Sequence, residues 1–158
     1  MKTQPAVIDI LNEALTNELT AVNQYVVHAS MCENWGFDLL HRRLRSLSID
    51  EMRDTEAIIK HILFREGVPN MQRLNPVRVG QNVEEILRLG LETELGAIAT
   101  LRSGIAICSE AEDYATRTMF EEMIREEEEH VDWFETQLEA IRIIGLEAYL
   151  SRQLYEND

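Results

Sequence analysis

The chain has 158 residues and a mass of 18.3 kDa, a length typical of one domain with its own core, and we expect a single domain over residues 1–158. Hydrophobic residues make up 45% and charged residues 28%, with only 7 Gly, 3 Pro and 2 Cys. This excludes a disordered, collagenous or disulfide-stapled protein. The net charge of −14 argues against nucleic acid and anionic membrane as partners.

The composition also bears on the compartment. No apolar run is long enough to span a bilayer, and the first residues carry no signal-peptide core, so the cytoplasm is the expected location. Cys32 and Cys108 lie far apart within helical patterns, and we expect both to be reduced, packed thiols.

Hydrophobic spacing of 3.6 residues covers most of the chain and predicts an all-α protein. The first helix is expected at about 6–34 and the second at about 39–66. A loop rich in Pro, Gly and Asn follows at 67–82. The third helix is expected at about 83–110, and the fourth runs from a break at 109–113 to about 144. A short fifth helix is expected at 147–154.

The lengths of the connections predict the topology. The first and third connections are tight, so they join antiparallel neighbours. The loop at 67–82 has 16 residues, which at about 3.3 Å each reach roughly 50 Å, more than the length of a 27-residue helix at 1.5 Å per residue. The pattern therefore predicts a ferritin-like four-helix bundle with one long crossover and a short fifth C-terminal helix.

Each of the four long helices presents an apolar stripe that is interrupted near its middle by carboxylates. In an antiparallel bundle the middles of the helices lie at one level, so the interruptions should meet. A histidine three residues after one of the acids completes a Glu-x-x-His pair on the fourth helix. The residues concerned are Glu18, Glu51, Asp54, Glu94, Glu127 and His130.

A multivalent cation is the natural compensation for these acids. Burying several unpaired carboxylates together is very costly, and no Lys or Arg lies near them on the stripes. Carboxylate oxygens with one or two imidazoles suit iron or manganese. Ferritin-like di-metal sites take one Glu from each of two helices and Glu-x-x-His from the other two.

An internal repeat strengthens this prediction. Glu18 and Glu51 are 33 residues apart, as are Glu94 and Glu127, and the two halves are offset by 76 residues. The offset relates His130 to Asp54, so one half of the site has an imidazole where the other has a shorter carboxylate.

Six segments along the chain are distinctive: 17–19, 23–25, 34–36, 48–52, 62–70 and 128–133. They resemble bacterioferritin, and the resemblance covers nearly the whole chain. The resemblance implies a shell of twenty-four subunits that stores ferric mineral, with a ferroxidase centre formed by Glu18, Glu51, Glu94, Glu127 and His130. It also implies a b-type haem between two subunits, with Met52 of each as axial ligand.

The sequence departs from the family pattern at two positions. Asp54 replaces the family's second ferroxidase histidine, and Ser46 stands where the family often has a histidine for iron on the inner surface, although Asp50 of that site remains. Because some bacterioferritins are mixed shells with one weaker subunit type, the chain is expected in a homo-oligomer or with a second bacterioferritin subunit.

Alternatives remain open for individual residues. On spacing alone, Met52 belongs to an outer stripe for dimer packing with Ile49, Ile59 and Leu63. Tyr25 either hydrogen-bonds the metal site or serves in electron transfer, or is a core tyrosine with a satisfied hydroxyl. The remaining histidines show no partner spacing and are expected at the surface or in interfaces: His28, His41 and His61.

The expected function is oxidation of Fe(II) by O2 or H2O2 at a di-iron centre, followed by storage of the ferric product. The main alternative is a structural, haem-binding subunit with weak or no ferroxidase activity, which receives electrons from a ferredoxin-type donor to release iron. A di-iron oxygenase or peroxidase on the same bundle is a weaker alternative, because the long crossover, the short loops and Met52 argue against it.

Overall fold

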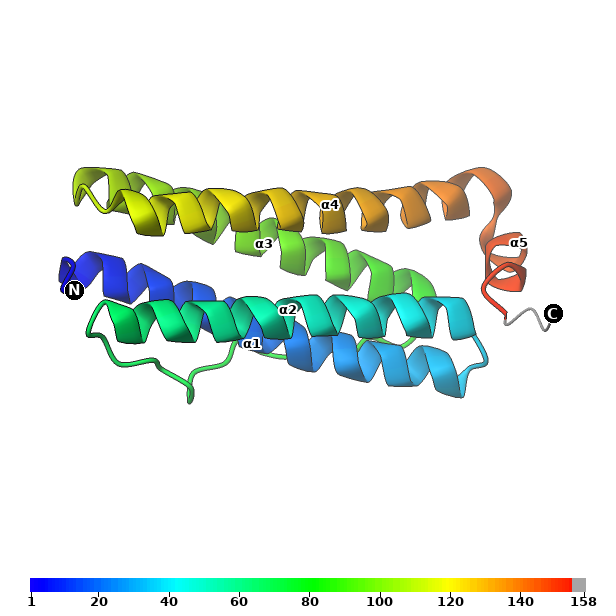
Figure 1. Cartoon of the computed structure of the whole chain (residues 1–158). Helices are drawn as coiled ribbons and strands as arrows, with labels where there is room; N and C mark the ends of the chain where they lie inside the picture. Colours follow the sequence, from blue (N-terminus) through cyan, green and yellow to red (C-terminus); the bar gives the residue numbers. More distant parts are fainter. Residues whose placement is uncertain (155–158) are drawn as a thin grey trace.

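The computed structural model describes residues 1–154, and within them the chain forms five helices and no strand. Figure 1 shows four long helices side by side, with the short fifth helix across one end. This confirms the predicted ferritin-like bundle with its long crossover. The helices are α1 (Pro5–Asn34), α2 (Asp38–Phe64), α3 (Val83–Glu110), α4 (Tyr114–Ile144) and α5 (Leu146–Ser151).

The helix ends follow from local backbone chemistry. Pro5 occupies the first turn of α1, where its missing N–H costs nothing. Asn82 caps α3 by accepting a hydrogen bond from the backbone N–H of Glu85, and Asp113 caps α4 by accepting one from Thr116. Helix α5 ends at Ser151, three residues earlier than expected, and Arg152 and Gln153 continue only as turns.

A left-handed residue stands two positions after the end of each of α1, α2 and α3. Gly36 adopts φ +86° after α1, as glycine does readily. The same position after α2 is Glu66, with φ 60°, and after α3 it is Glu112, with φ 55°. An L-residue with a side chain is strained in this region, so these two turns carry a local cost that the first does not.

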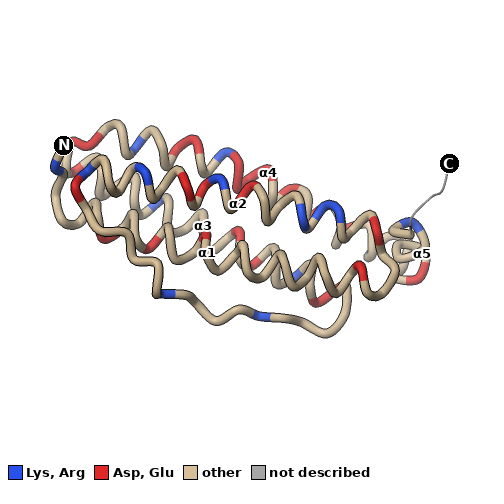
Figure 2. The backbone as a smooth tube through the Cα atoms, turned by 60° about the horizontal axis from the view of Figure 1, so that its bottom comes forward, with Lys and Arg blue, Asp and Glu red and all other residues tan. Residues whose placement is uncertain are grey.

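The segment 65–82 forms a strap along α1 (Figure 2). Its polar groups are bonded to α1 in succession. Asn70 N–H donates to Asn12 Oδ1 at 2.7 Å, Asn75 N–H to Thr20 Oγ1 at 3.0 Å, and Arg78 N–H to Gln24 Oε1 at 3.2 Å. These side chains lie every one to two turns along α1, so the strap carries the chain to the far end of the bundle, as its length predicts.

Two apolar clusters fill the bundle on either side of its middle. One joins the second half of α1, the first half of α2, the start of α3 and the end of α4 with α5. The other joins the first half of α1, the end of α2, the end of α3 and the start of α4. The predicted acids lie at the level between the two clusters, so an apolar core lies on either side of a polar centre along the bundle.

Two glycines of α3 allow close packing within these clusters. A Cβ at Gly90 would lie 2.3 Å from the ring of Phe134, and one at Gly104 would lie 2.5 Å from the ring of Phe120. Both aromatic rings are fully buried, so neither can move aside cheaply.

Within residues 1–154, no helix combines the length and the apolar character needed to cross a lipid bilayer.

Candidate metal centre

The predicted acids and the histidine come together at the middle of the bundle. Five of the six side chains are at most 5% exposed, and Asp54 is partly buried. Helix α1 contributes Glu18, α2 contributes Glu51 and Asp54, and α3 contributes Glu94. Glu127 and His130 lie one turn apart on the inward face of α4.

The donor atoms form two overlapping groups, each with all its atoms within 4.8 Å of one another. One group consists of Glu51, Glu94, Glu127 and His130. The other consists of Glu18, Glu51, Asp54 and Glu127. Glu51 and Glu127 belong to both groups, which is what two bridging carboxylates would require, and the internal repeat relates one group to the other.

The cluster leaves many buried polar atoms without a well-aligned hydrogen bond. Of the ten such side-chain atoms among residues 1–154, seven belong to these six residues, including both oxygens of Glu127. Buried polar groups are almost always satisfied in native proteins. Because the seven atoms converge from four helices, and because they are hard oxygen donors with one imidazole, their chemistry fits a pair of iron or manganese ions.

Burial and mutual repulsion perturb the acids in the absence of metal. Burial and the charge of Glu51 raise the pKa of Glu94 to about 7, although His130 and Tyr25 oppose the shift. Burial, Glu51 and Glu126 raise the pKa of Asp54 to about 8. Burial and Glu51 also raise the pKa of Glu18. The metal-free centre therefore holds protons where a cation would otherwise lie.

His130 and Glu51 shift in the opposite sense. Burial lowers the pKa of His130, but its interactions with Glu51 and Glu94 outweigh burial and raise the pKa to about 10. Its Nδ1 lies 3.1 Å from Glu51 Oε1 and 3.3 Å from Glu94 Oε1. Burial raises the pKa of Glu51, but interactions with Glu18 and His130 outweigh burial, so the pKa lies below its ordinary value. The imidazolium thus substitutes for part of the missing positive charge.

Tyr25 is both a core residue and a partner of the site. Its ring is fully buried, 5.9 Å from that of Phe134, and its hydroxyl donates a hydrogen bond of 2.6 Å to Glu94 Oε1. Burial and the charge of Glu94 raise the pKa of Tyr25 well above its ordinary value, so the hydroxyl stays protonated. Two of the alternatives for Tyr25 are therefore true at once: it is a core tyrosine with a satisfied hydroxyl, and that hydroxyl bonds to the site.

A pocket of about 260 Å³ opens on the α2 and α4 side of the cluster. Asp54 and His130 form part of its wall and connect it to the metal-binding atoms. The others, Asp50, Arg53, Glu126 and Glu129, lie closer to solvent. The negative charge of this wall would attract cations toward the centre.

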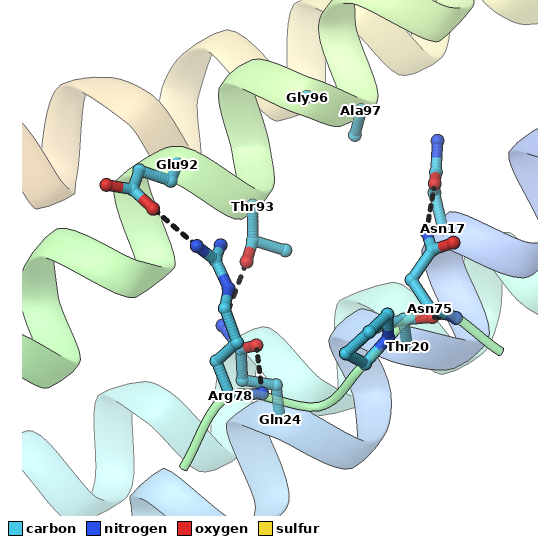
Figure 3. A pocket seen from close by; sticks show the side chains of 10 residues that line it. Asn17, Thr20, Gln24, Asn75, Arg78, Glu92, Thr93, Gly96 and Ala97 are labelled. Carbon is cyan, nitrogen blue, oxygen red and sulfur yellow. Dashed lines mark hydrogen bonds and ion pairs between the residues drawn. The ribbon is translucent and has the colours of Figure 1, made fainter. Parts of the chain in front are cut away.

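A second pocket, of about 300 Å³, lies between α1, α3 and the strap (Figure 3). Hydrogen bonds across it join the three elements. Gln24 Nε2 donates to Thr93 Oγ1 at 2.8 Å, and Asn75 Nδ2 donates to Asn17 Oδ1 at 2.9 Å. Asn17 and Thr93 are the neighbours of Glu18 and Glu94 in the chain, so these bonds fix the segments that carry two of the candidate ligands.

The structure does not bring Met52 to this cluster. Met52 is 43% exposed on the outside of α2, and Ile49 (45%) and Leu63 (57%) are exposed with it, as the spacing predicts. Ile59 of the same stripe is instead partly buried against the core. Ser46 is half-buried and lies one turn before Asp50 on α2. Neither residue belongs to the two donor groups.

One prediction for the other histidines is wrong. His28 is fully buried, and its Nε2 lies 2.9 Å from the carbonyl oxygen of Arg78 in the strap. Burial lowers the pKa of His28 from its ordinary value. Its role is to bind the strap to α1, which its position within the chain did not indicate. His41 and His61 are half-buried.

Sequence reasoning also missed two contacts beside the cluster. His130 Nε2 lies 3.4 Å from Asp50 Oδ2, and Glu126 lies within hydrogen-bonding reach of Asp54. The repeat offset of 76 residues relates Asp50 to Glu126 just as it relates Asp54 to His130. The repeat could therefore have indicated both contacts from the sequence.

Comparison with known proteins agrees with this fold. Residues 8–144 match the family described as "Ferritin-like domain". Curated relatives named bacterioferritin are 44% identical in Mycolicibacterium paratuberculosis (149 residues, 94% of each chain) and 44% identical in Streptomyces coelicolor (151 residues, 96% of this chain and 90% of the relative). A bacterioferritin of Brucella melitensis is 42% identical over 94% of this chain and 92% of its own.

The chain belongs to the bacterioferritin family. The matched segment contains all six residues of the metal cluster and the whole strap. The family membership and the convergence of unpartnered carboxylates are independent observations, one from sequence similarity and one from geometry. Both are compatible with a metal site at the middle of the bundle.

Proposed function

We propose that the protein stores iron, and that it oxidises Fe(II) at the six-residue cluster before the ferric product is deposited inside a multi-subunit shell. The observation that carries this proposal is the pair of donor groups sharing Glu51 and Glu127. Two cation positions side by side suit a two-electron reaction. Two Fe(II) ions supply two electrons and become Fe(III), and two protons from solvent complete the conversion of O2 to H2O2, or of H2O2 to two water molecules.

The residues have distinct parts in this proposal. Glu51 and Glu127 bridge the two Fe(II) substrates, Glu18 and Glu94 are terminal ligands, and His130 and Asp54 complete the two ends. Before the metal arrives, the raised pKa values of Glu94 and Asp54 leave protons on the cluster at neutral pH. Fe(II) displaces these protons, so binding is coupled to proton release.

The direct test is the rate of Fe(II) oxidation by the assembled protein. We expect wild type to form Fe(III) faster than a protein-free control, and Glu127→Gln to lose most of this acceleration because a bridging carboxylate is gone. Glu128→Gln is the matched control, since Glu128 is the adjacent residue and is exposed. Equal rates for wild type and Glu127→Gln would overturn the proposed activity.

Assembly into a shell is part of the proposal. Large apolar side chains are exposed on α1, α2 and the strap, among them Val26, Ile49, Met52, Val68 and Met71. Because exposed apolar surface is often covered by another subunit, we infer that these side chains belong to interfaces within the shell. Native mass spectrometry should find a large closed oligomer, a homo-oligomer or one mixed with a second bacterioferritin subunit. A monomer or simple dimer at micromolar concentration would contradict this.

A second candidate function is supported by Met52 and Asp54. An exposed thioether on an apolar stripe fits one axial ligand of a b-type haem, with Met52 of a second subunit as the other. Such a haem supplies one-electron transfer, which a ferredoxin-type donor would use to reduce and release stored iron. If Asp54 weakens the ferroxidase centre, the chain would serve mainly as a structural and haem-binding subunit.

Haem binding has its own test. Protein supplied with haem should show the absorption spectrum of iron with two thioether ligands, and Met52→Leu should abolish it while the shell stays intact. Met71→Leu is the control, because Met71 is another exposed methionine (51%) that lies on the strap. Unchanged haem binding by Met52→Leu would remove Met52 from the site.

A further inference from the structure

His130 has two ring nitrogens that face different surroundings. Nδ1 points into the cluster, where it lies 3.1 Å from Glu51 Oε1, 3.3 Å from Glu94 Oε1 and 3.9 Å from Glu127 Oε2. Nε2 points toward the pocket and lies 3.4 Å from Asp50 Oδ2. The ring is only 5% exposed, so its orientation decides which nitrogen a metal at the cluster would meet.

One oxygen of Asp50 faces His130. Its other oxygen, Oδ1, lies 3.9 Å from the guanidinium of Arg53, one turn further along α2. The carboxylate thus lies between an exposed cation and the imidazole. A histidine that binds a metal usually donates its second ring N–H to such a carboxylate, which fixes the tautomer, orients the ring and strengthens the ligand.

We propose that Asp50 is a positioning residue for His130, whose carboxylate keeps the imidazole turned so that Nδ1 faces the metal-binding oxygens. The inference rests on the proposed function, because it assigns Nδ1 to a cation at the cluster. It gives Asp50 a role within the subunit that does not depend on residue 46, which is serine in this chain.

The internal repeat supplies an independent argument. Asp50 directly precedes the shared carboxylate Glu51, and Glu126 directly precedes the shared carboxylate Glu127. Asp50 faces His130 on the other half, and Glu126 faces Asp54 on the other half. Each half therefore places an outer acid beside the residue that completes the other half, so the same kind of contact recurs at the two positions that the repeat relates.

The test compares Asp50→Ala and Asp50→Asn, because Asn keeps an oxygen that accepts a hydrogen bond from Nε2. Co(II) is the probe, followed by calorimetry and by its visible absorption spectrum. Wild type should bind two Co(II) per subunit. In Asp50→Ala, the site containing His130 should weaken about tenfold or more, and Asn should restore most of the affinity. Asp50 is half-buried on the side of α2, so all variants should fold.

Glu129→Ala is the matched control. Glu129 lines the same pocket and is exposed, but forms no ion pair with His130 in the described structure. Its removal should leave the Co(II) affinity within about twofold of wild type. Equal weakening by Asp50→Ala and Glu129→Ala would overturn the positioning role, since it would show that only the total charge of the pocket matters.

Crystals of the metal-free variants give a second readout that does not require metal. The His130 ring should keep its orientation in wild type and Asp50→Asn, and should rotate or occupy several orientations in Asp50→Ala. An unmoved ring in Asp50→Ala, together with unchanged Co(II) binding, would overturn the inference. Failure of wild type to bind Co(II) at the cluster would instead overturn the proposed function, and the metal-free crystals would still report on Asp50.

Discussion

The hydroxyl of Tyr25 donates a hydrogen bond of 2.6 Å to Oε1 of Glu94, across the level where the four helices bring their acids together. The other oxygen of Glu94, Oε2, has no hydrogen bond. Tyr25 therefore satisfies one side of this carboxylate and leaves the other side free, which orients the free oxygen for a cation.

Replacing Tyr25 by Phe should separate this role from packing. The ring would still fill the core, but Glu94 Oε1 would lose its shorter hydrogen bond and keep only His130 Nδ1 at 3.3 Å. This loss should cost about 1–2 kcal/mol in the free energy of unfolding at pH 8. Affinity for Co(II) should fall about tenfold, because a ligand loses its orienting bond. Calorimetry and denaturant unfolding measure the two effects.

Tyr149→Phe is the control for that experiment. Tyr149 is also buried, and its hydroxyl donates to the neutral side chain of Gln137 at 2.8 Å, away from the metal cluster. It should lower stability by a similar or smaller amount and leave Co(II) binding unchanged. Equal Co(II) affinity in both variants would show that the bond to Glu94 does not orient a metal ligand.

Asp54→His should make the two halves of the centre alike. The exchange replaces a short carboxylate by an imidazole, removes one negative charge and places a donor beside Glu126. We expect balanced occupancy of the two metal positions and a faster initial rate of Fe(II) oxidation in a homo-oligomeric shell. The gain should shrink in Asp54→His/Glu126→Ala, which lacks the acid facing the new ring.

The opposite result would be equally informative. If wild type already oxidises two Fe(II) per subunit rapidly, and Asp54→His is no faster, Asp54 is a competent ligand and the centre has no defect. If neither protein oxidises Fe(II) above the protein-free control, the structural and haem-binding subunit becomes the better description.

The stability of the metal-free protein should fall as pH rises. In the folded protein the pKa of Glu94 is about 7, that of Asp54 about 8 and that of His130 about 10, all above the ordinary values of 4.5, 3.8 and 6.5. The folded state therefore binds more protons than the unfolded state at neutral pH. Stability that is fully present below the ordinary pKa values is lost as pH rises through the folded ones.

Thermal unfolding of metal-free protein between pH 5 and 9 measures this slope. Saturation with Co(II) should flatten or reverse it, because the metal replaces the protons. Asp54→Asn should remove part of the slope between pH 6 and 9, since one raised carboxyl is gone. A metal-free melting temperature that rises steadily to pH 9 would contradict the predicted protonation of the cluster.

Relief of backbone strain should stabilise the turn between α3 and α4. Glu112 is exposed and adopts φ 55°, so Glu112→Gly should raise the free energy of unfolding by up to about 1 kcal/mol. Ala106→Gly, at an exposed position inside α3, should lower it by about 0.5–1 kcal/mol. Denaturant unfolding of both variants checks the difference in sign.

The periodicity of apolar residues predicted most of the fold. The spacing of apolar residues located each long helix, and the length of the segment before Val83 predicted a crossover along the whole bundle. The carboxylates were found because they interrupt that spacing, and the level at which they meet follows from antiparallel packing. A conflict between burial and charge is thus visible in sequence when it is repeated on four helices.

Contacts between side chains of different helices were not predictable in the same way. The burial of His28 depends on where the strap crosses α1, and the contact of Asp50 with His130 depends on how α2 and α4 are rotated about their axes. The left-handed turns at Glu66 and Glu112 occur without glycine, so no local residue preference marks them. These features arise from packing and leave little trace in one sequence.

Counting the metal ions at the cluster is the most direct measurement. Crystals of the assembled protein, soaked anaerobically in Fe(II), would be measured at the iron absorption edge. The anomalous difference map should show two peaks in each subunit, one among Glu51, Glu94, Glu127 and His130, and one among Glu18, Glu51, Asp54 and Glu127. A map with no iron between these side chains, and iron only at the surface, would contradict the proposed centre.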